Sequence, residues 1–179
     1  MNATTSGAAG APAAADGGSG PRTPDRARAA AAAVVDPELR VVTIDELGIL
    51  RDVAILDERA VVTITPTYTG CPAMDVIRAD IRAALAAAGW PDAEVRTVYS
   101  PAWSTDWISP AGRTKLAAAG ISPPAPVRAG PVPLTLLRTR CPRCGSADTE
   151  QLSRFGSTAC KSLWRCRACR EPFDHLKAL

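Results

Sequence analysis

Aromatic residues, histidine and long apolar runs are all scarce in this sequence. Aromatic side chains make up 4% of the 179 residues and there is a single histidine, so a core must be built mainly from Ala, Val, Ile and Leu. The longest uncharged apolar run, residues 29–35, is far shorter than the roughly 18–20 residues that a membrane span requires. The chain also starts without a leucine-rich stretch of the signal-peptide kind. These absences predict a cytoplasmic protein with no membrane partner.

A large excess of charge of one sign is missing as well. The 21 Lys and Arg nearly balance the 18 Asp and Glu, and the net charge of +3 is too small for a chain-wide binder of polyanions. Nucleic acid is therefore not a predicted partner, and it stays only as an alternative for the basic C-terminal part. No phosphate-binding glycine loop and no pair of catalytic carboxylates is visible. We therefore do not predict that the chain is catalytic by itself.

Composition divides the chain into four segments. Residues 1–23 are almost all small or polar and predict a disordered tail. Residues 24–120 predict a small α/β domain, and residues 121–133, with five prolines, predict a semi-rigid linker. Residues 134–179 hold five of the six cysteines. The predicted class is α+β, with an α/β domain followed by a C-terminal zinc ribbon.

Hydrophobic periodicity gives the α/β domain the order helix, strand, strand, helix, strand, helix. A strand–helix–strand crossover implies at least one parallel pair of strands. The expected elements are a helix from Pro24, a hairpin of strands at 49–56 and 60–65, a helix from Pro72 to Gly89, a strand at 94–99 and a helix at 111–119.

The clustered cysteines form two Cys-x-x-Cys pairs, Cys141 with Cys144 and Cys166 with Cys169, separated by 21 residues. Two such turns can bring four thiolates into a tetrahedron, the geometry of structural zinc. The residues between the pairs can form a hairpin, which completes a zinc ribbon. Four cysteines leave no open coordination position, so a structural Zn²⁺ is favoured over iron or a cluster on the same ligands. Arginines beside the ligands are expected to offset their charge and to donate to sulfur.

The remaining cysteines, Cys71 and Cys160, lie outside these pairs. Cys71 lies between Gly70 and Pro72, at the predicted start of the long helix. Gly70 is expected to permit close backbone approach. The free N–H groups and the helix dipole at this position favour a thiolate. It could be a nucleophile, a ligand of a labile metal or only a small residue. No histidine lies in residues 24–120, so a Cys–His pair is excluded there, and as a cluster ligand Cys71 would need a homodimer or a client protein. Cys160 is expected to be a buried small residue, with redox or metal exchange as the alternative.

Two polar segments supply further candidates for supporting Cys71. The loop at 100–110 contains Trp103, expected to cover the core, and Asp106, expected to cap a turn or to orient the thiol if the loops meet. Asp36 and Glu38 belong to an Asp-Pro-Glu-Leu sequence, where they either end a helix with solvated carboxylates or contribute to the same site.

Several of these motifs together resemble a known combination of domains. Asp36-Pro-Glu-Leu39, Thr65-Pro-Thr-Tyr-x-Gly-Cys-Pro72 and Pro101-x-Trp-x-x-Asp106 are similar to the domain of SufT-like iron–sulfur assembly factors. Phe155-Gly-Ser-Thr-x-Cys-Lys161 and Cys166-x-x-Cys-Arg-Glu-Pro-Phe173 resemble the PaaD/PaaJ family of phenylacetyl-CoA epoxidase subunits. The chain lacks the terminal cysteine that many members carry.

This resemblance implies a role in aerobic phenylacetate degradation, in which a di-iron oxygenase and an iron–sulfur reductase epoxidise phenylacetyl-CoA. It implies an accessory protein that helps to assemble metal centres, with a transient iron–sulfur cluster as cargo and the other epoxidase subunits, above all the reductase, as partners. The family's assembly cysteine falls on Cys71, its ribbon ligands fall on the two cysteine pairs, and Cys160 belongs to the family pattern. A structural subunit of the oxygenase and a thiol redox carrier are the alternatives.

Overall fold

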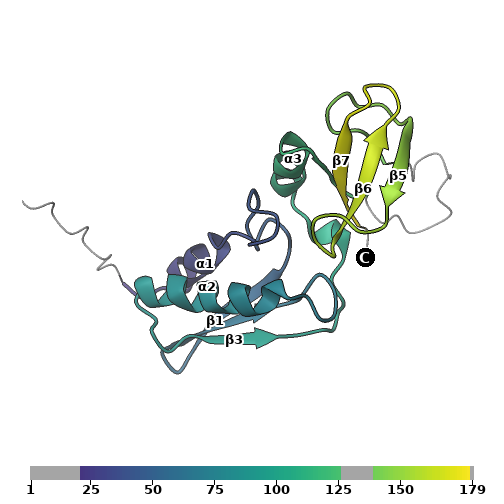
Figure 1. The fold of residues 1–179 in the computed structure, drawn as a ribbon. Coiled ribbons are helices and arrows are strands. Elements are labelled where there is room, and N and C mark those ends of the chain that lie inside the picture. Colours follow the sequence, from purple (N-terminus) through teal and green to yellow (C-terminus); the bar gives the residue numbers. More distant parts are fainter. Residues whose placement is uncertain (1–20, 126–138, 178–179) are drawn as a thin grey trace, which may run out of the picture.

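The computed structural model describes residues 21–125 and 139–177. Residues 1–20 of the predicted tail and residues 126–133 of the predicted linker therefore lie outside the described residues. Figure 1 shows two units: an α/β unit (residues 24–118), in which two helices lie along a three-stranded sheet, and a ribbon unit (residues 121–125 and 139–177) with a sheet of its own. None of the described helices has the length and apolar character needed to cross a bilayer.

The α/β unit has the predicted order of elements and the predicted parallel pair. Its elements are α1 (Pro24–Ala32), β1 (Leu50–Leu56), β2 (Arg59–Ile64), α2 (Ala73–Ala87), β3 (Glu94–Thr97), the 3₁₀ turn η1 (Thr105–Trp107) and α3 (Pro110–Ala118). β1 and β2 pair antiparallel, while β3 adds to β2 in parallel. The mixed helix and strand content confirms the predicted α+β class.

The amphipathic pattern of α2 explains how this helix is held against the sheet. Ile77, Ile81 and Leu85 recur at spacings of four residues and are completely buried. The helix is followed by Gly89, whose φ of +102° is a backbone conformation that glycine adopts at low cost. Packing thus holds α2 against the sheet, and Cys71 lies just before the N-terminal end of this helix.

The ribbon unit contains more strands than the sequence indicated. Beside the predicted hairpin of β5 (Thr149–Ser153) and β6 (Lys161–Cys166), the sheet contains β7 (Pro172–Leu176) and the two-residue β4 (Ile121–Ser122), in the order β4-β7-β6-β5. β4 pairs in parallel with β7. The first two residues of the predicted linker are thus part of the ribbon sheet. A segment of two residues is too short to show a pattern from which this strand could be predicted.

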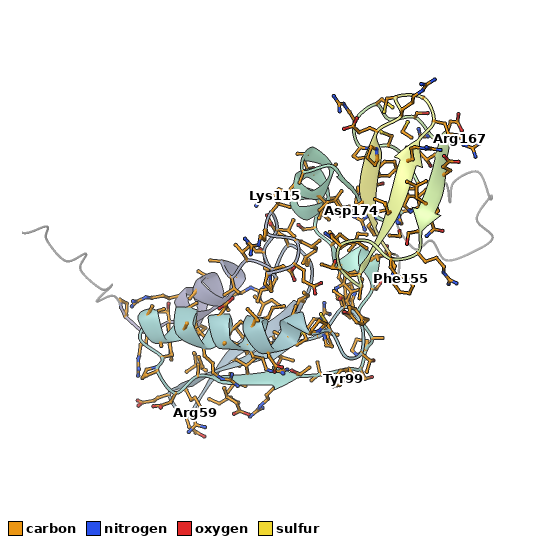
Figure 2. All side chains as sticks on the ribbon, in the orientation of Figure 1. Arg59, Tyr99, Lys115, Phe155, Arg167 and Asp174 are labelled. Atoms are coloured by element: carbon orange, nitrogen blue, oxygen red, sulfur yellow. The ribbon has the colours of Figure 1, made fainter. Side chains whose placement is uncertain are left out.

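The two units share one hydrophobic core. Cys160 and Leu176 of the ribbon unit are buried in the same cluster as Leu39, Leu47 and Ile77 of the α/β unit. The opposite end of the ribbon has a separate small cluster around its cysteine pairs. Figure 2 shows Arg167 at that cysteine end and Phe155 at the end nearer the α/β unit. The end of the ribbon that carries Cys160 is therefore the end that packs into the shared core.

Candidate metal and thiol sites

The four paired cysteines converge at one end of the ribbon. All four sulfur atoms lie within 4.8 Å of one another, and none is in a disulfide. The Sγ atoms of Cys141 and Cys169 are 3.7 Å apart, and those of Cys144 and Cys166 are 3.5 Å apart. A tetrahedral ion with metal–sulfur bonds of about 2.3 Å would separate its sulfur ligands by about 3.8 Å. The donor set therefore fits a four-thiolate metal centre of the kind that zinc forms.

The two cysteine pairs have nearly the same backbone geometry. The residue after each pair, Gly145 and Arg170, has a positive φ, of +74° and +64° respectively. The first cysteine of each pair donates its N–H to a carbonyl five residues later, from Cys141 to Ser146 and from Cys166 to Glu171. The left-handed residue turns each chain back toward its metal ligands, and only the first pair uses glycine for it.

The arginines near this centre contact carboxylates rather than sulfur. Arg143 forms an ion pair of 2.8 Å with Glu171, and both Arg165 and Arg167 are paired with Glu150. Within residues 139–177, no arginine is seen to donate to a cysteine sulfur. Carboxylates thus hold the guanidinium groups of Arg143, Arg165 and Arg167, and donation from arginine to the ligands stays a prediction.

Cys71 lies one residue before Pro72, the N-cap of α2. Gly70 before it has a φ of +85°, while a Cβ at this position would meet no atom within 4 Å. Gly70 therefore adopts a backbone conformation that favours glycine, and no described part of the chain approaches it closely. Burial raises the pKa of the Cys71 thiol, against the N–H of Ala73 and the hydroxyl of Tyr68, which lower it. The expected preference for a thiolate is thus wrong, because the cost of burying the charge exceeds the effect of the helix start.

A small cavity at the junction of the units brings Cys71 and Cys160 together. Its volume is about 20 Å³, which is room for about one water molecule or one ion. The α/β unit contributes Asp36, Glu38 and Cys71, and the ribbon unit contributes Cys160. The remaining wall consists of Leu39, Leu47, Ile49, Thr67, Met74, Ile77, Trp103 and Leu176. Two thiols and two carboxylates therefore share an otherwise mostly apolar cavity.

Cys160 contacts both units through its sulfur. Its Sγ lies 3.4 Å from Oε2 of Glu38 and 3.1 Å from the hydroxyl of Thr158. Burial, opposed by the Thr158 hydroxyl and reinforced by the Glu38 carboxylate, raises the pKa of Cys160 to about 11. This thiol is buried, as expected for a small core residue, but it also meets a carboxylate of the other unit.

Asp36 holds Glu38 in position. Its side chain is buried, and Oδ1 accepts the N–H groups of Glu38 and Leu39 at 2.9 and 2.8 Å. Burial raises the pKa of Asp36 above its ordinary value. The interpretation of Asp36 as a solvated carboxylate is therefore wrong, since it is an internal cap for the turn that carries Glu38 to the junction.

Comparisons with known proteins agree with this two-unit arrangement. Residues 24–98 match the iron–sulfur cluster assembly protein family, and residues 135–177 match the PaaD zinc β-ribbon domain. Over 148 residues the chain is 45% identical to a subunit of the 1,2-phenylacetyl-CoA epoxidase of Escherichia coli (strain K12), covering 82% of this chain and 87% of that protein. The chain belongs to the PaaD family.

Two further comparisons each cover about half of this PaaD-family chain. The Fe-S protein maturation auxiliary factor YitW of Bacillus subtilis (strain 168) is 42% identical over 79 residues, which cover 42% of this chain and 76% of that protein. The crystal structure of a DUF59 domain from Bacillus anthracis aligns with a TM-score of 0.49 at 33% identity, covering 52% of this chain and 90% of that one. Membership of the PaaD family makes the chain a relative of the epoxidase subunit, with an iron–sulfur assembly domain and a metal-binding ribbon.

The structure gathers most but not all of the predicted supporting residues around Cys71. Trp103 is one wall of the cavity and donates from Nε1 to the carbonyl of Leu47 at 2.9 Å, which agrees with its predicted role over the core. Asp106 is exposed on η1 and does not line the cavity, and Ser104 caps that turn instead. The loop at 100–110 therefore reaches the site only through Trp103.

Sequence reasoning missed Tyr68, which lies three residues before Cys71. Its hydroxyl is buried and makes no regular hydrogen bond to the described residues, although it is close enough to Cys71 to affect that thiol. Burial, followed by the charges of Cys71 and its neighbours, raises the pKa of Tyr68 to about 12. Its place in the Thr-Pro-Thr-Tyr-Thr-Gly-Cys loop was the available signal.

Proposed function

We propose that this chain is a cytoplasmic accessory protein that assists metal-centre assembly in the phenylacetyl-CoA epoxidase system, with Cys71 as the residue that handles iron or a transient iron–sulfur cluster. The iron–sulfur reductase of that system is the proposed client. The observation that supports this function best is the position of Cys71: its thiol opens into a cavity that also holds a second thiol and two carboxylates.

The size of the cavity argues against chemistry on an organic substrate. Pockets that bind drug-sized molecules are typically about 300–1,000 Å³, whereas the cavity at Cys71 is about 20 Å³. A coenzyme A ester cannot enter such a space, but a single ion can. Cys71 is therefore proposed to handle metal or sulfide and not the phenylacetyl group.

The thiol chemistry argues against a redox carrier. Reactive thiols depend on a lowered pKa, which gives them a large thiolate fraction at neutral pH. The pKa of Cys71 is raised, and that of Cys160 is raised to about 11. Such thiols stay protonated until a metal ion displaces the protons, which is the behaviour of metal ligands.

The ribbon ligands have a separate role in this proposal. Four cysteines fill the tetrahedral shell of a Zn²⁺ ion and leave no position for a substrate. β6 extends from Lys161 to Cys166, so at about 3.3 Å per residue Cys160 lies about 20 Å from the centre. We therefore propose structural Zn²⁺ at Cys141, Cys144, Cys166 and Cys169, and assembly chemistry at Cys71.

The test compares the metal content of the reductase made with and without this chain. Iron and acid-labile sulfide are measured after production with no accessory chain, with the wild type, with Cys71→Ser, or with Thr69→Ser. Thr69 is an exposed residue of the same loop and provides a matched control. We expect a deficit that the wild type and Thr69→Ser restore and that Cys71→Ser does not.

Full loading of the reductase in every case would overturn the proposed function. If the chain then co-purified with the oxygenase in fixed stoichiometry, it would be a structural subunit. The circular dichroism and zinc content of Cys71→Ser must match those of the wild type, so that a loading deficit reports on the thiol.

A further inference from the structure

We propose that Cys71, Cys160 and Glu38 form a binding site for one thiophilic divalent cation, with Fe²⁺ as the physiological ion, at the junction between the α/β unit and the ribbon unit. The choice of iron rests on the proposed assembly function, while the binding itself can be tested on the purified chain. In this inference the ribbon unit supplies Cys160 as one of the three metal ligands.

The donor atoms in the cavity select the class of ion. Two thiols and a carboxylate suit ions such as Fe²⁺, Co²⁺ and Zn²⁺, whereas Mg²⁺ and Ca²⁺ prefer shells of oxygen alone. The free volume of about 20 Å³ accepts one ion. Asp36 adds negative charge behind Glu38. Lys161 is paired with Asp174 at 3.2 Å, and the ammonium group of Lys177 donates to the carbonyl of Ala159. The cavity thus favours a cation.

Two of the three ligands already have a suitable separation. The sulfur of Cys160 and Oε2 of Glu38 are 3.4 Å apart. With metal–sulfur and metal–oxygen bonds of about 2.3 and 2.1 Å, a tetrahedral ion separates such ligands by about 3.6 Å. Asp36 fixes Glu38 by accepting N–H groups of its turn, so the carboxylate is held at the cavity before an ion arrives.

Cys71 completes the site by a local movement. Among groups of three or more possible ligands in the described residues, only the four ribbon cysteines have all their ligand atoms within 4.8 Å of one another. Cys71 therefore has to move toward the Cys160–Glu38 pair. It lines the same cavity and lies at the end of a loop, directly after Gly70. Binding therefore requires the Cys71 side chain to close onto the ion.

The Tyr68 hydroxyl, which acts on the Cys71 thiol and lowers its pKa, is placed to support Cys71 as a metal ligand. It is buried beside Cys71 without a regular hydrogen-bond partner in the described parts of the chain. A buried hydroxyl is stabilised when it donates a hydrogen bond to a neighbouring acceptor. A metal-bound Cys71 thiolate would accept this hydrogen bond, as the groups surrounding a metal's ligands usually do.

Binding is a ligand exchange in which no electrons are transferred. The S–H bonds of Cys71 and Cys160 break, two metal–sulfur bonds form, and two protons leave to solvent. Glu38 coordinates as a carboxylate, which gives the ion three ligands from this chain. The fourth position is open, so the ion can be passed to a client's ligand.

The test adds Co²⁺, without oxygen, to the full chain with zinc in its ribbon. Cobalt bound to thiolates absorbs in the near ultraviolet, and metal analysis after dialysis gives cobalt and zinc per chain. We expect one cobalt per chain in addition to the zinc. Cys71→Ser, Cys160→Ser and Glu38→Gln should each weaken cobalt binding by about tenfold or more, and the two cysteine variants should also reduce the absorption. Thr69→Ser should change neither.

Three outcomes would overturn the inference: no cobalt beyond the zinc sites, cobalt that enters only by displacing zinc, or cobalt binding that survives in both cysteine variants. If Cys160→Ser does not fold, Cys160→Ala replaces it. Cobalt binding together with full loading of the reductase in the absence of the chain would retain this site and reject the proposed function. The two failures can therefore be told apart.

Discussion

The sulfur of Cys160 lies 3.4 Å from the carboxylate of Glu38, although the two residues are 122 positions apart in the sequence. This contact joins the ribbon unit to the α/β unit beside Cys71. Leu176 of β7 packs into the same junction. The fold thus places the thiol of Cys160, from the ribbon unit, at the same cavity as the thiol of Cys71, from the α/β unit.

The first prediction concerns the core shared by the two units. Replacement of the buried Leu176 by alanine should lower the free energy of unfolding by about 2–4 kcal/mol, because it removes apolar contacts and leaves a cavity. Leu152 of the same sheet is 47% exposed, and its replacement by alanine should cost less than about 0.5 kcal/mol. Denaturant unfolding of both variants measures the difference. Equal effects would mean that the units do not share a core.

The sequence predicts local features of this protein better than the junction. The stripe of α2 follows from the spacing of Ile77, Ile81 and Leu85, and the metal centre follows from two Cys-x-x-Cys pairs. Both signals are contained in short segments. The meeting of Cys71 with Cys160 depends on how the ribbon packs, and no local pattern encodes that contact.

Two expectations from the sequence fail for the same physical reason. The alternative in which Asp36 is a solvated carboxylate and the preference of Cys71 for the thiolate are both overturned by burial, which raises the pKa of each group. Burial depends on which segments cover a residue, so the dipole and capping arguments available from sequence lack the largest contribution to the pKa. Strand β4 is not predicted from the sequence for a different reason, because a strand of two residues is too short to show hydrophobic periodicity.

The second prediction separates the two kinds of cysteine. Cys166→Ser should release the zinc and unfold the ribbon, since Cys166 is one of four ligands and is completely buried. Cys160→Ser should retain one zinc per chain, because Cys160 lies about 20 Å from the centre. Metal analysis after dialysis decides between them. Loss of zinc from Cys160→Ser would show that the two sites are coupled.

The third prediction uses the unequal turns after the cysteine pairs. Arg170 has a φ of +64° where the first pair has Gly145, and this conformation is unfavourable for a residue with a Cβ. Arg170→Gly should therefore stabilise the zinc-loaded ribbon by up to about 1 kcal/mol, after the greater freedom of glycine in the unfolded chain is subtracted.

The control for this substitution is Arg143→Gly in the first pair. Arg143 has no positive φ and is ion-paired with Glu171, so glycine should be neutral or destabilising there. The midpoint of thermal unfolding, measured in excess zinc, ranks the variants. A lower midpoint for Arg170→Gly than for the wild type would contradict the argument from backbone strain.

The last prediction concerns acid stability. Burial lowers the pKa of His175 to about 4, while in the unfolded chain it is near its ordinary value of about 6.5. Between these pH values only the unfolded chain binds the proton. His175 therefore leaves the free energy of unfolding unchanged above about pH 6.5, and it lowers that free energy as the pH falls from 6.5 toward 4. From pH 7.5 to 5.5, the wild type should lose about 1.4 kcal/mol more than His175→Gln. Zinc loss at low pH affects both proteins alike, so parallel curves in denaturant unfolding would contradict a buried neutral His175.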